Sequence, residues 1–192
     1  MSGLTSRRIF MSNPNIVLVH GNGGLTAEDI WFPEAKTELE AIGLEVIAQT
    51  MPDNMLARSI KWLPFLEDVL GANENSIIVG HSSGAVAAMR YAETHRIFGS
   101  VLVGAMHTDL GIRSEKMSGY YDEPWDWNAI KASQNWIVQF ASTDDPFIPI
   151  EEPRHIHAKL NTDYHEHGNK GHFTDLWFPE LVTVIKEKIL VE

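Results

Sequence analysis

The chain has 192 residues and carries 26 acidic against 15 basic side chains, for a formal net charge of −11. This excess of negative charge disfavours binding to nucleic acid or to an anionic membrane surface, and no apolar run approaches the roughly 20 residues that cross a bilayer. Cysteine is absent, which excludes disulfides, thiolate metal sites and a cysteine nucleophile. We expect a cytoplasmic protein that binds neither nucleic acid nor a membrane.

The length suits one domain, because a chain of this size can bury roughly 70% of the surface that it exposes when unfolded. The segment 1–14 contains two adjacent arginines, as twin-arginine export signals do, but the apolar stretch that such a signal requires does not follow them. We therefore expect 1–14 to be a disordered extension and 15–192 to form a single domain.

Short apolar segments rich in β-branched residues alternate along the chain with longer stretches whose apolar residues recur at helical spacing. This alternation predicts an α/β fold with a mostly parallel central sheet and helices on both faces, because parallel neighbours need a long crossover that a helix supplies. In chain order we expect a strand at 16–19, a helix around 33–42, a weaker strand at 44–48, a helix around 56–70, a strand at 76–79, a helix around 84–94, strands at 100–103 and 136–140, a candidate last strand at 163–167 and a helix around 176–190.

Two stretches interrupt this regular alternation. Pro64 falls inside the helix expected around 56–70 and should kink or divide it, since proline lacks an amide donor and crowds the preceding turn. The segment 106–127 has no clean period and contains two glycines, a proline and four large aromatic residues. We expect this segment to be an irregular excursion above the sheet.

The most informative motif is Gly80-His81-Ser82-Ser83-Gly84, which lies between a predicted strand and a predicted helix. Gly-x-Ser-x-Gly in this context is typical of a nucleophile elbow, a strained turn that exposes a serine hydroxyl at the edge of an α/β-hydrolase sheet. The two glycines leave the space that such a turn needs. We interpret Ser82 as a nucleophile and the Ser83 amide as one donor of an oxyanion hole. A tight turn without chemistry is the alternative.

A serine nucleophile needs a base to take its proton and an acidic residue to orient that base. In α/β hydrolases the chain order is serine, acid, histidine. The strand expected at 136–140 is followed by Asp144 and Asp145, and either could face the site from the end of that strand. Pro146 favours extended backbone at the residue before it, which suits a carboxylate on a rigid loop. We therefore favour Asp145 as the acid and leave Asp144 open.

Five histidines follow this acidic loop. His172 alone lies in a glycine-flanked loop between the candidate last strand and the C-terminal helix, where we expect the base. His155 and His157 fall in a helix-like polar stretch, and His165 and His167 would share one face of an edge strand, so we interpret both pairs as surface residues. Zinc binding by these pairs is the alternative, but no third ligand stands at a recognisable spacing. We expect no metal and no cofactor.

The first predicted strand ends in His20-Gly21-Asn22-Gly23-Gly24. Glycines in such a turn let backbone amides approach a reacting carbonyl group. We interpret the Asn22 amide as the second oxyanion donor. A dinucleotide-binding loop is the alternative, but threonine occupies the last glycine position of the G-x-G-x-x-G pattern.

Five segments together carry a resemblance to a known family: His20-Gly21-Asn22-Gly23-Gly24, Gly80-His81-Ser82-Ser83-Gly84, Met89-Arg90-Tyr91-Ala92-Glu93-Thr94-His95, Ser142-Thr143-Asp144-Asp145-Pro146-Phe147 and Gly171-His172-Phe173. They resemble the retinoblastoma-binding protein 9 family of small serine hydrolases, over about residues 15–190. The resemblance implies an α/β-hydrolase fold with a minimal cap or none, and it places the family's catalytic triad at Ser82, Asp145 and His172.

The name of that family refers to a Leu-x-Cys-x-Glu segment proposed to bind the retinoblastoma protein. The corresponding segment here is Leu70-Gly71-Ala72-Asn73-Glu74, in which alanine replaces the cysteine. We therefore do not expect this chain to share that partner.

We predict a serine hydrolase that cleaves a small ester, or an amide or thioester, through an acyl-Ser82 intermediate. Trp31, Trp125 and Trp127 are expected to line an apolar pocket for this small-molecule substrate. The alternative is a non-catalytic protein-binding module on a hydrolase scaffold, because a fold does not dictate a function. Decay of the triad would indicate that alternative, and all three candidate residues are present.

Overall fold

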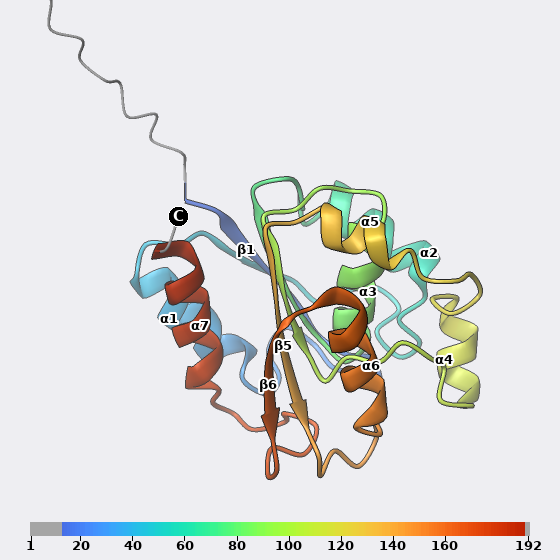
Figure 1. The fold of residues 1–192 in the computed structure, drawn as a ribbon. Helices are drawn as coiled ribbons and strands as arrows, with labels where there is room; N and C mark the ends of the chain where they lie inside the picture. Colours follow the sequence, from blue (N-terminus) through green and yellow to red (C-terminus); the bar gives the residue numbers. More distant parts are fainter. Residues whose placement is uncertain (1–12, 191–192) are drawn as a thin grey trace, which may run out of the picture.

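Six parallel strands form one sheet with helices packed on both faces in the computed structural model (Figure 1). The structure describes residues 13–190, so most of the extension expected at 1–14 lies outside the described residues. In chain order the elements are β1 (Asn15–Val19), α1 (Phe32–Ala41), β2 (Val46–Ala48), α2 (Ser59–Asp68), β3 (Ser76–His81), α3 (Ser83–Ala92), β4 (Gly99–Val103), α4 (Arg113–Ser118), α5 (Trp127–Ala132), β5 (Trp136–Ser142), α6 (Glu151–Leu160), β6 (Asp163–His167) and α7 (Pro179–Leu190).

The strands lie in the order β2-β1-β3-β4-β5-β6, and each neighbouring pair is parallel. The chain adds β2 on one side of β1 and then crosses over to place β3 on the other side. Ligands of open parallel sheets bind beyond the carboxyl ends of the strands, at the point where the strand order reverses. The topology therefore directs attention to the loops that follow β1 and β3.

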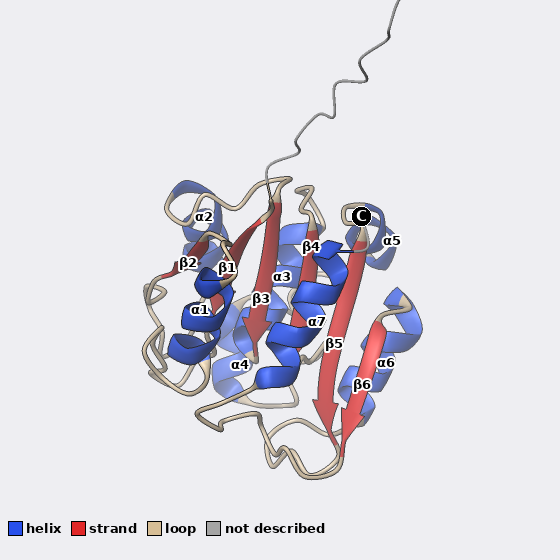
Figure 2. Ribbon diagram, turned by 90° about the vertical axis from the view of Figure 1, so that its left-hand side faces the viewer, coloured by secondary structure: helices blue, strands red, loops and turns tan. Residues whose placement is uncertain are grey.

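Helices α1 and α7 cover one face of the sheet, and α2, α3, α5 and α6 cover the other (Figures 1 and 2). Consecutive residues of β1 point to opposite faces: Ile16 and Leu18 pack in the core under α1 and α7, whereas Val17 and Val19 pack in the core under α2 and α3. Both faces are apolar, which is why the strand appears in the sequence as an unbroken hydrophobic run. No helix within residues 13–190 is long and apolar enough to span a bilayer.

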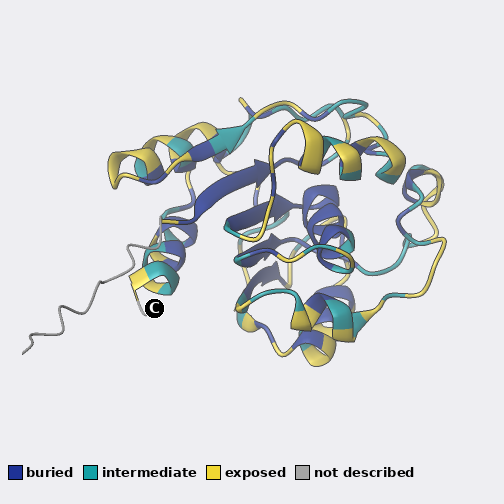
Figure 3. Cartoon of the chain, turned by 90° about the horizontal axis from the view of Figure 1, so that it is seen from above, coloured by how far each residue is buried: buried dark blue, intermediate teal, exposed yellow. Residues whose placement is uncertain are grey.

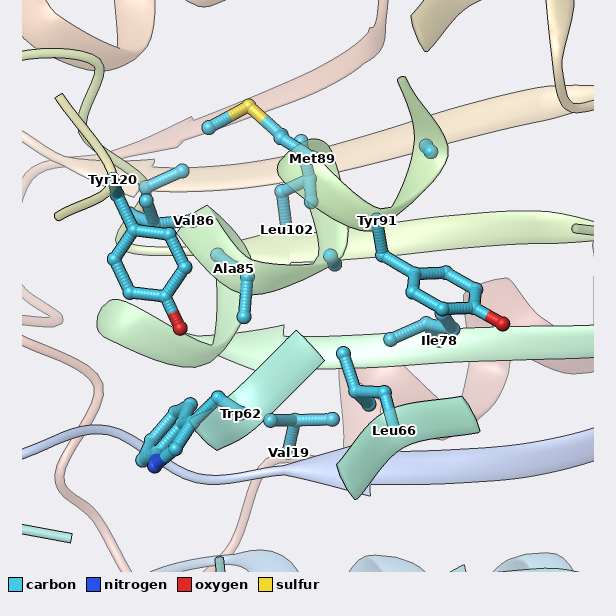
Figure 4. Packing of buried hydrophobic residues seen from close by; sticks show 14 of the residues in the cluster. Val19, Trp62, Leu66, Ile78, Ala85, Val86, Met89, Tyr91, Leu102 and Tyr120 are labelled. Carbon is cyan, nitrogen blue, oxygen red and sulfur yellow. The ribbon is translucent and has the colours of Figure 1, made fainter. Parts of the chain in front are cut away.

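The core under α2 and α3 is the larger of the two apolar layers and anchors the helix that follows Ser82. Figure 4 shows Met89 and Ala85 of α3 above Ile78 of the sheet, with Leu66 and Trp62 of α2 beside them. Seen from above, the central strands β1, β3 and β4 and helix α3 are almost entirely buried, whereas the outer sides of the surrounding helices are exposed (Figure 3). Helix α3 is therefore fixed on nearly all sides.

The predicted α/β-hydrolase architecture is confirmed, with two local departures. Helix α2 is continuous through Pro64, so the proline does not divide it. Pro64 lies on the exposed side of the helix, and Ile60, whose carbonyl loses its usual amide partner, is 80% exposed. The segment 106–127 was expected to be irregular, but it contains α4 and the first residue of α5. A helix of six residues is too short to show a periodic pattern in sequence.

Gly84, in the first turn of α3, packs directly on the backbone at the end of β1. A Cβ at this position would collide with the carbonyl of Val19 and would lie 2.7 Å from the carbonyl oxygen of His20. We predict that Gly84→Ala lowers the free energy of unfolding by about 1–3 kcal/mol, because the helix must move away from the sheet. Urea denaturation measures this change.

Gly168→Ala is the matched control for this substitution. A Cβ at residue 168 would meet only the Thr143 hydroxyl at 3.8 Å, an ordinary van der Waals contact, so the expected change is within about 0.5 kcal/mol. Equal losses in the two variants would contradict the close approach of α3 to β1.

Candidate active site

Ser82 joins β3 to α3 in a strained backbone conformation, with φ 55° and ψ −120°. Residues other than glycine rarely adopt this region, which costs of the order of 1–3 kcal/mol. The Ser82 amide donates to the carbonyl of Val103 at 2.8 Å, and the Ser82 carbonyl accepts from the amides of Ala85 and Val86 at 2.9 and 3.2 Å. These hydrogen bonds to β4 and within α3 hold the turn in the strand-turn-helix geometry that the sequence predicts.

His172 and Asp145 form a hydrogen-bonded pair beside this turn. Nδ1 of His172 lies 2.7 Å from Oδ2 of Asp145, and Oδ1 of Asp145 accepts from the amides of Phe147 and Ile148 at 2.9 and 3.1 Å. Because a carboxylate can only accept, the imidazole donates to it through Nδ1. The side chains of His172 and Asp145 are only 10% and 3% exposed. The imidazole of His172 is thus held in one orientation by a largely buried carboxyl group.

Asp144, the alternative acid, points elsewhere. Its Oδ1 accepts hydrogen bonds from the Ser142 hydroxyl at 2.6 Å and from the Gly171 amide at 2.8 Å, and these bonds, the one from Ser142 above all, lower the pKa of Asp144. Asp144 thereby ties the loop that carries His172 to the end of β5. The structure brings Asp145, and not Asp144, to His172.

His81 lies fully buried beneath the turn and links it to the histidine loop. Its Nε2 is 2.7 Å from the carbonyl oxygen of His172, and the two rings lie 4.8 Å apart. Burial, reinforced by the nearby His172, lowers the pKa of His81 to about 3. The ring is therefore neutral, and Nε2 carries the hydrogen that it donates to the carbonyl. No local sequence pattern indicates this link, because the two histidines are 91 residues apart.

We predict that His81 makes the stability of the protein depend on pH. The unfolded chain binds a proton at His81 below about pH 6.5, whereas the folded chain does not until about pH 3. Lowering the pH through this window therefore favours the unfolded state. The variant His81→Gln does not titrate, so the stability difference between wild type and variant should narrow by up to about 1.4 kcal/mol per pH unit. Urea denaturation at pH 7, 5 and 4 measures it, and a constant difference would contradict the prediction.

Ser82 and His172 line the same cavity, whose volume is about 550 Å³. The loop after β1 contributes Gly21, Asn22 and Gly23 to it, and α4 contributes Glu115. Most of the remaining wall is apolar and comes from loops that follow the strands: Leu25, Met55, Leu56, Met106, Leu110, Ile112, Phe147 and Ile148. No local pattern in the sequence marks these side chains, because their convergence depends on how the loops fold over the sheet.

The loop after β1 approaches the serine closely, because a Cβ at residue 21 would lie 3.1 Å from Cβ of Ser82, tighter than most such contacts. His20 fixes this loop. Its Nε2 accepts from the amide of Met51 at 2.8 Å, and its Nδ1 lies 2.7 Å from the carbonyl oxygen of Gly21. Burial lowers the pKa of His20, so the neutral ring donates through Nδ1. Because a peptide group is planar, holding the Gly21 carbonyl also fixes the direction of the Asn22 N–H.

The backbone amides of Asn22 and Ser83 have no hydrogen-bond partner in the part of the chain that the structure describes. The Ser83 amide belongs to the first turn of α3, where amides lack intrahelical partners and the helix dipole is positive. These are the two amides that the sequence suggests as oxyanion donors.

The three tryptophans expected at the substrate pocket lie elsewhere. Trp31 is buried in the core, where its indole N–H donates to the carbonyl of Phe173 at 2.9 Å. Trp125 lies 3.7 Å from the Arg90 guanidinium, and Trp127 stacks on Trp125 at 5.5 Å. Both rings face a separate depression. Cation–π contact and core packing engage these rings, and none of the three lines the cavity beside Ser82.

The remaining histidines of the C-terminal third belong to other contacts. His155 stacks on His107 at 4.0 Å, and His165 and His167 each lie 3.3–3.4 Å from a carboxylate oxygen of Glu180. Within residues 13–190 no group of three or more histidine, cysteine, aspartate or glutamate side chains is arranged to hold a metal ion.

A parallel sheet that carries a serine on a strained turn, with a histidine and an aspartate on the later strand loops, defines the class of α/β hydrolases. A family model described as "Serine hydrolase" matches residues 16–176 of this chain. The chain is also 44% identical to "Serine hydrolase RBBP9" of Rattus norvegicus over 182 residues, which cover 93% of this chain and 98% of that protein. The chain therefore belongs to this family of serine hydrolases, as the resemblance in its sequence implies, and it is an enzyme.

Solved structures of lower identity share the fold. The ydeN gene product of Bacillus subtilis superposes with a TM-score of 0.82 at 23% identity, covering 91% of this chain and 97% of that one. Est1E of Butyrivibrio proteoclasticus, solved with ferulic acid bound, superposes with a TM-score of 0.74 at 16% identity, covering 92% and 88%. At these identities the likeness shows the α/β-hydrolase fold alone.

Proposed function

We propose that the chain hydrolyses a small ester, or an amide or thioester, through an acyl-Ser82 intermediate. The observation that carries the proposal is the 2.7 Å hydrogen bond between His172 and Asp145 at a cavity that Ser82 also lines. A histidine whose Nδ1 is held by a carboxylate presents Nε2 as a general base. A serine at the start of a helix, next to unpartnered amides, is the nucleophile that such a base serves.

In the first half of the reaction, Ser82 Oγ attacks the substrate carbonyl carbon while Nε2 of His172 takes the hydroxyl proton. Asp145 stabilises the imidazolium that forms. The carbonyl oxygen becomes negatively charged and accepts hydrogen bonds from the amides of Asn22 and Ser83, with the positive end of the α3 dipole behind them. Collapse of this intermediate breaks the bond to the leaving group, which receives the proton from His172.

In the second half, water attacks the acyl-Ser82 carbonyl and His172 again removes a proton. The same two amides accept the charge of the second oxyanion, after which the proton returns to Ser82 Oγ and the carboxylic acid leaves. Each group thus serves twice, and the enzyme ends in its starting state. The residues suffice for this chemistry without a cofactor.

The lining of the cavity favours an apolar acyl group. Its wall is made mainly of aliphatic side chains, and two of the apolar residues at its mouth, Met55 and Phe147, are 62% and 64% exposed. Burying such surface against a substrate is favourable at roughly 25 cal/mol per Å². We therefore infer a small molecule with an uncharged, hydrophobic acyl group as the substrate and as the principal partner of this site.

Covalent labelling tests the nucleophile. We expect a fluorophosphonate probe to label the wild-type protein near neutral pH and to leave Ser82→Ala unlabelled, because the probe reacts only with an activated serine hydroxyl. Intact-mass spectrometry measures the adduct. Ser133→Ala, a change of the same size on a loop outside the cavity, should label like the wild type. Equal labelling of wild type and Ser82→Ala would end the proposal.

Paired amide substitutions test which aspartate orients His172. Asp145→Asn should lower kcat by about 10⁴-fold, because an asparagine stabilises the wrong imidazole tautomer. Asp144→Asn keeps the carbonyl oxygen that accepts from Ser142 and Gly171, so we expect its kcat to stay within about tenfold of the wild type. Steady-state hydrolysis of a p-nitrophenyl ester measures kcat for both variants. A larger loss of kcat in Asp144→Asn than in Asp145→Asn would show that Asp144, and not Asp145, orients His172.

A further inference from the structure

Helix α4 forms one wall of the cavity and carries a carboxyl group that reaches the loop after β1. Oε1 of Glu115 accepts a hydrogen bond from the side-chain amide of Asn22 at 2.6 Å, across 93 residues of sequence. Glu115 is only 7% exposed, yet it lines the cavity together with Ser82 and His172. The contact is thus a direct bridge between the segment above the sheet and the proposed oxyanion loop.

A carboxyl group in this position is costly to keep. Burial raises the pKa of Glu115, and the hydrogen bond from Asn22 only partly opposes that shift. No arginine, lysine or histidine of the described residues forms an ion pair with it. Packing alone would be served better by an apolar side chain, since a buried polar group is unfavourable unless its hydrogen bonds repay the loss of water. The hydrogen bond to Asn22 is the interaction that distinguishes Glu115 from such a residue.

The loop after β1 is anchored on both sides of Asn22. Upstream, His20 holds the Gly21 carbonyl at 2.7 Å. Downstream, the amides of Gly23 and Gly24 donate to backbone carbonyls of the 54–55 segment at 3.4 and 3.1 Å. Between these anchors the Asn22 amide has no partner among the described residues, and its neighbour Gly23 has φ 73°, a conformation from which a glycine moves at low cost.

The side chain of Asn22 is therefore the remaining point at which this stretch can be fixed. Within residues 13–190 its Nδ2 donates to Glu115 alone. A backbone amide stabilises a developing negative charge only while its N–H points at that charge. Loss of one such donor costs about 10²–10³ in rate. A hydrogen bond that holds Asn22 in place protects that contribution.

We propose that Glu115 is a positioning residue of this enzyme, which holds Asn22 so that its backbone amide stays directed at the oxyanion. The inference rests on the proposed function, because it assigns a residue to that reaction. Glu115 acts through Asn22 and not on the reacting atoms. Its contribution therefore depends on a hydrogen-bond acceptor and not on a charge.

Kinetics of four variants on p-nitrophenyl butyrate test the proposal. Glu115→Ala and Asn22→Ala should each lower kcat by about 10–100-fold, less than the loss of a whole donor, with KM within threefold of the wild type. Asn22→Ala keeps the backbone amide and removes only its anchor. Glu115→Gln keeps an Oε1 acceptor for Asn22, so its kcat should return to within about threefold of the wild type. Because both single changes break one contact, the double variant should lose no more than either single variant.

Lys116→Ala, at an exposed neighbouring position of α4, is the matched control and should leave kcat and KM unchanged. Multiplied losses in the double variant would show that the two residues act independently and would overturn the proposal. So would a loss confined to KM, or a Glu115→Gln variant as slow as Glu115→Ala. If Glu115→Ala fails to fold, the kcat of Asn22→Ala tests the same contact. An Asn22→Ala variant with unchanged kcat would then overturn the proposal.

The test also separates this inference from the proposed function. If Ser82→Ala hydrolyses the ester as fast as the wild type, the proposed function itself fails. If hydrolysis requires Ser82 but is indifferent to the contact between Glu115 and Asn22, the function stands and only the positioning role is lost.

Discussion

The close approach of α3 to the end of β1 is the constraint on which the site depends. Gly84 allows the first turn of the helix to rest on the backbone of the strand, and Ser82 is left at the junction with φ 55°. The loop after β1 then passes directly beside Ser82, where a Cβ at residue 21 would lie 3.1 Å from Cβ of Ser82. The backbone strain at the turn, of the order of 1–3 kcal/mol, is offset by the apolar cores on both faces of the sheet.

Two buried histidines on opposite sides of this junction each hold a backbone carbonyl through a hydrogen bond. His20 and His81 both have a pKa lowered by burial, so each stays neutral and can donate one hydrogen to a backbone carbonyl. His20 holds the carbonyl of Gly21, and His81 holds the carbonyl of His172. A neutral imidazole is a compact donor that adds no charge beneath the reaction centre. The two histidines thereby set the positions of the proposed oxyanion loop and the proposed base relative to Ser82.

The sequence predicts those features whose physical cause is local. Alternating apolar segments indicate the parallel sheet, and the glycine spacing around Ser82 indicates the strained turn. The position of Pro146 favours Asp145, which is the aspartate that meets His172 in the structure. The cavity wall is different, because Glu115 meets Asn22 across 93 residues and no local pattern marks Glu115 or its contact with the glycine-rich loop. The prediction that three tryptophans line the substrate pocket is wrong for the same reason. An aromatic side chain suits a pocket and a core equally well, and only tertiary packing decides between them.

A crystal structure of the protein after reaction with a phosphonate ester tests the central claim most directly, since the tetrahedral phosphorus mimics the proposed oxyanion intermediate. The account predicts a covalent bond from Ser82 Oγ to phosphorus, with the phosphonyl oxygen 2.7–3.1 Å from the amides of both Asn22 and Ser83. Nε2 of His172 should lie within hydrogen-bond reach of Ser82 Oγ. An adduct whose oxygen points away from those amides, or one attached to another residue, would contradict it.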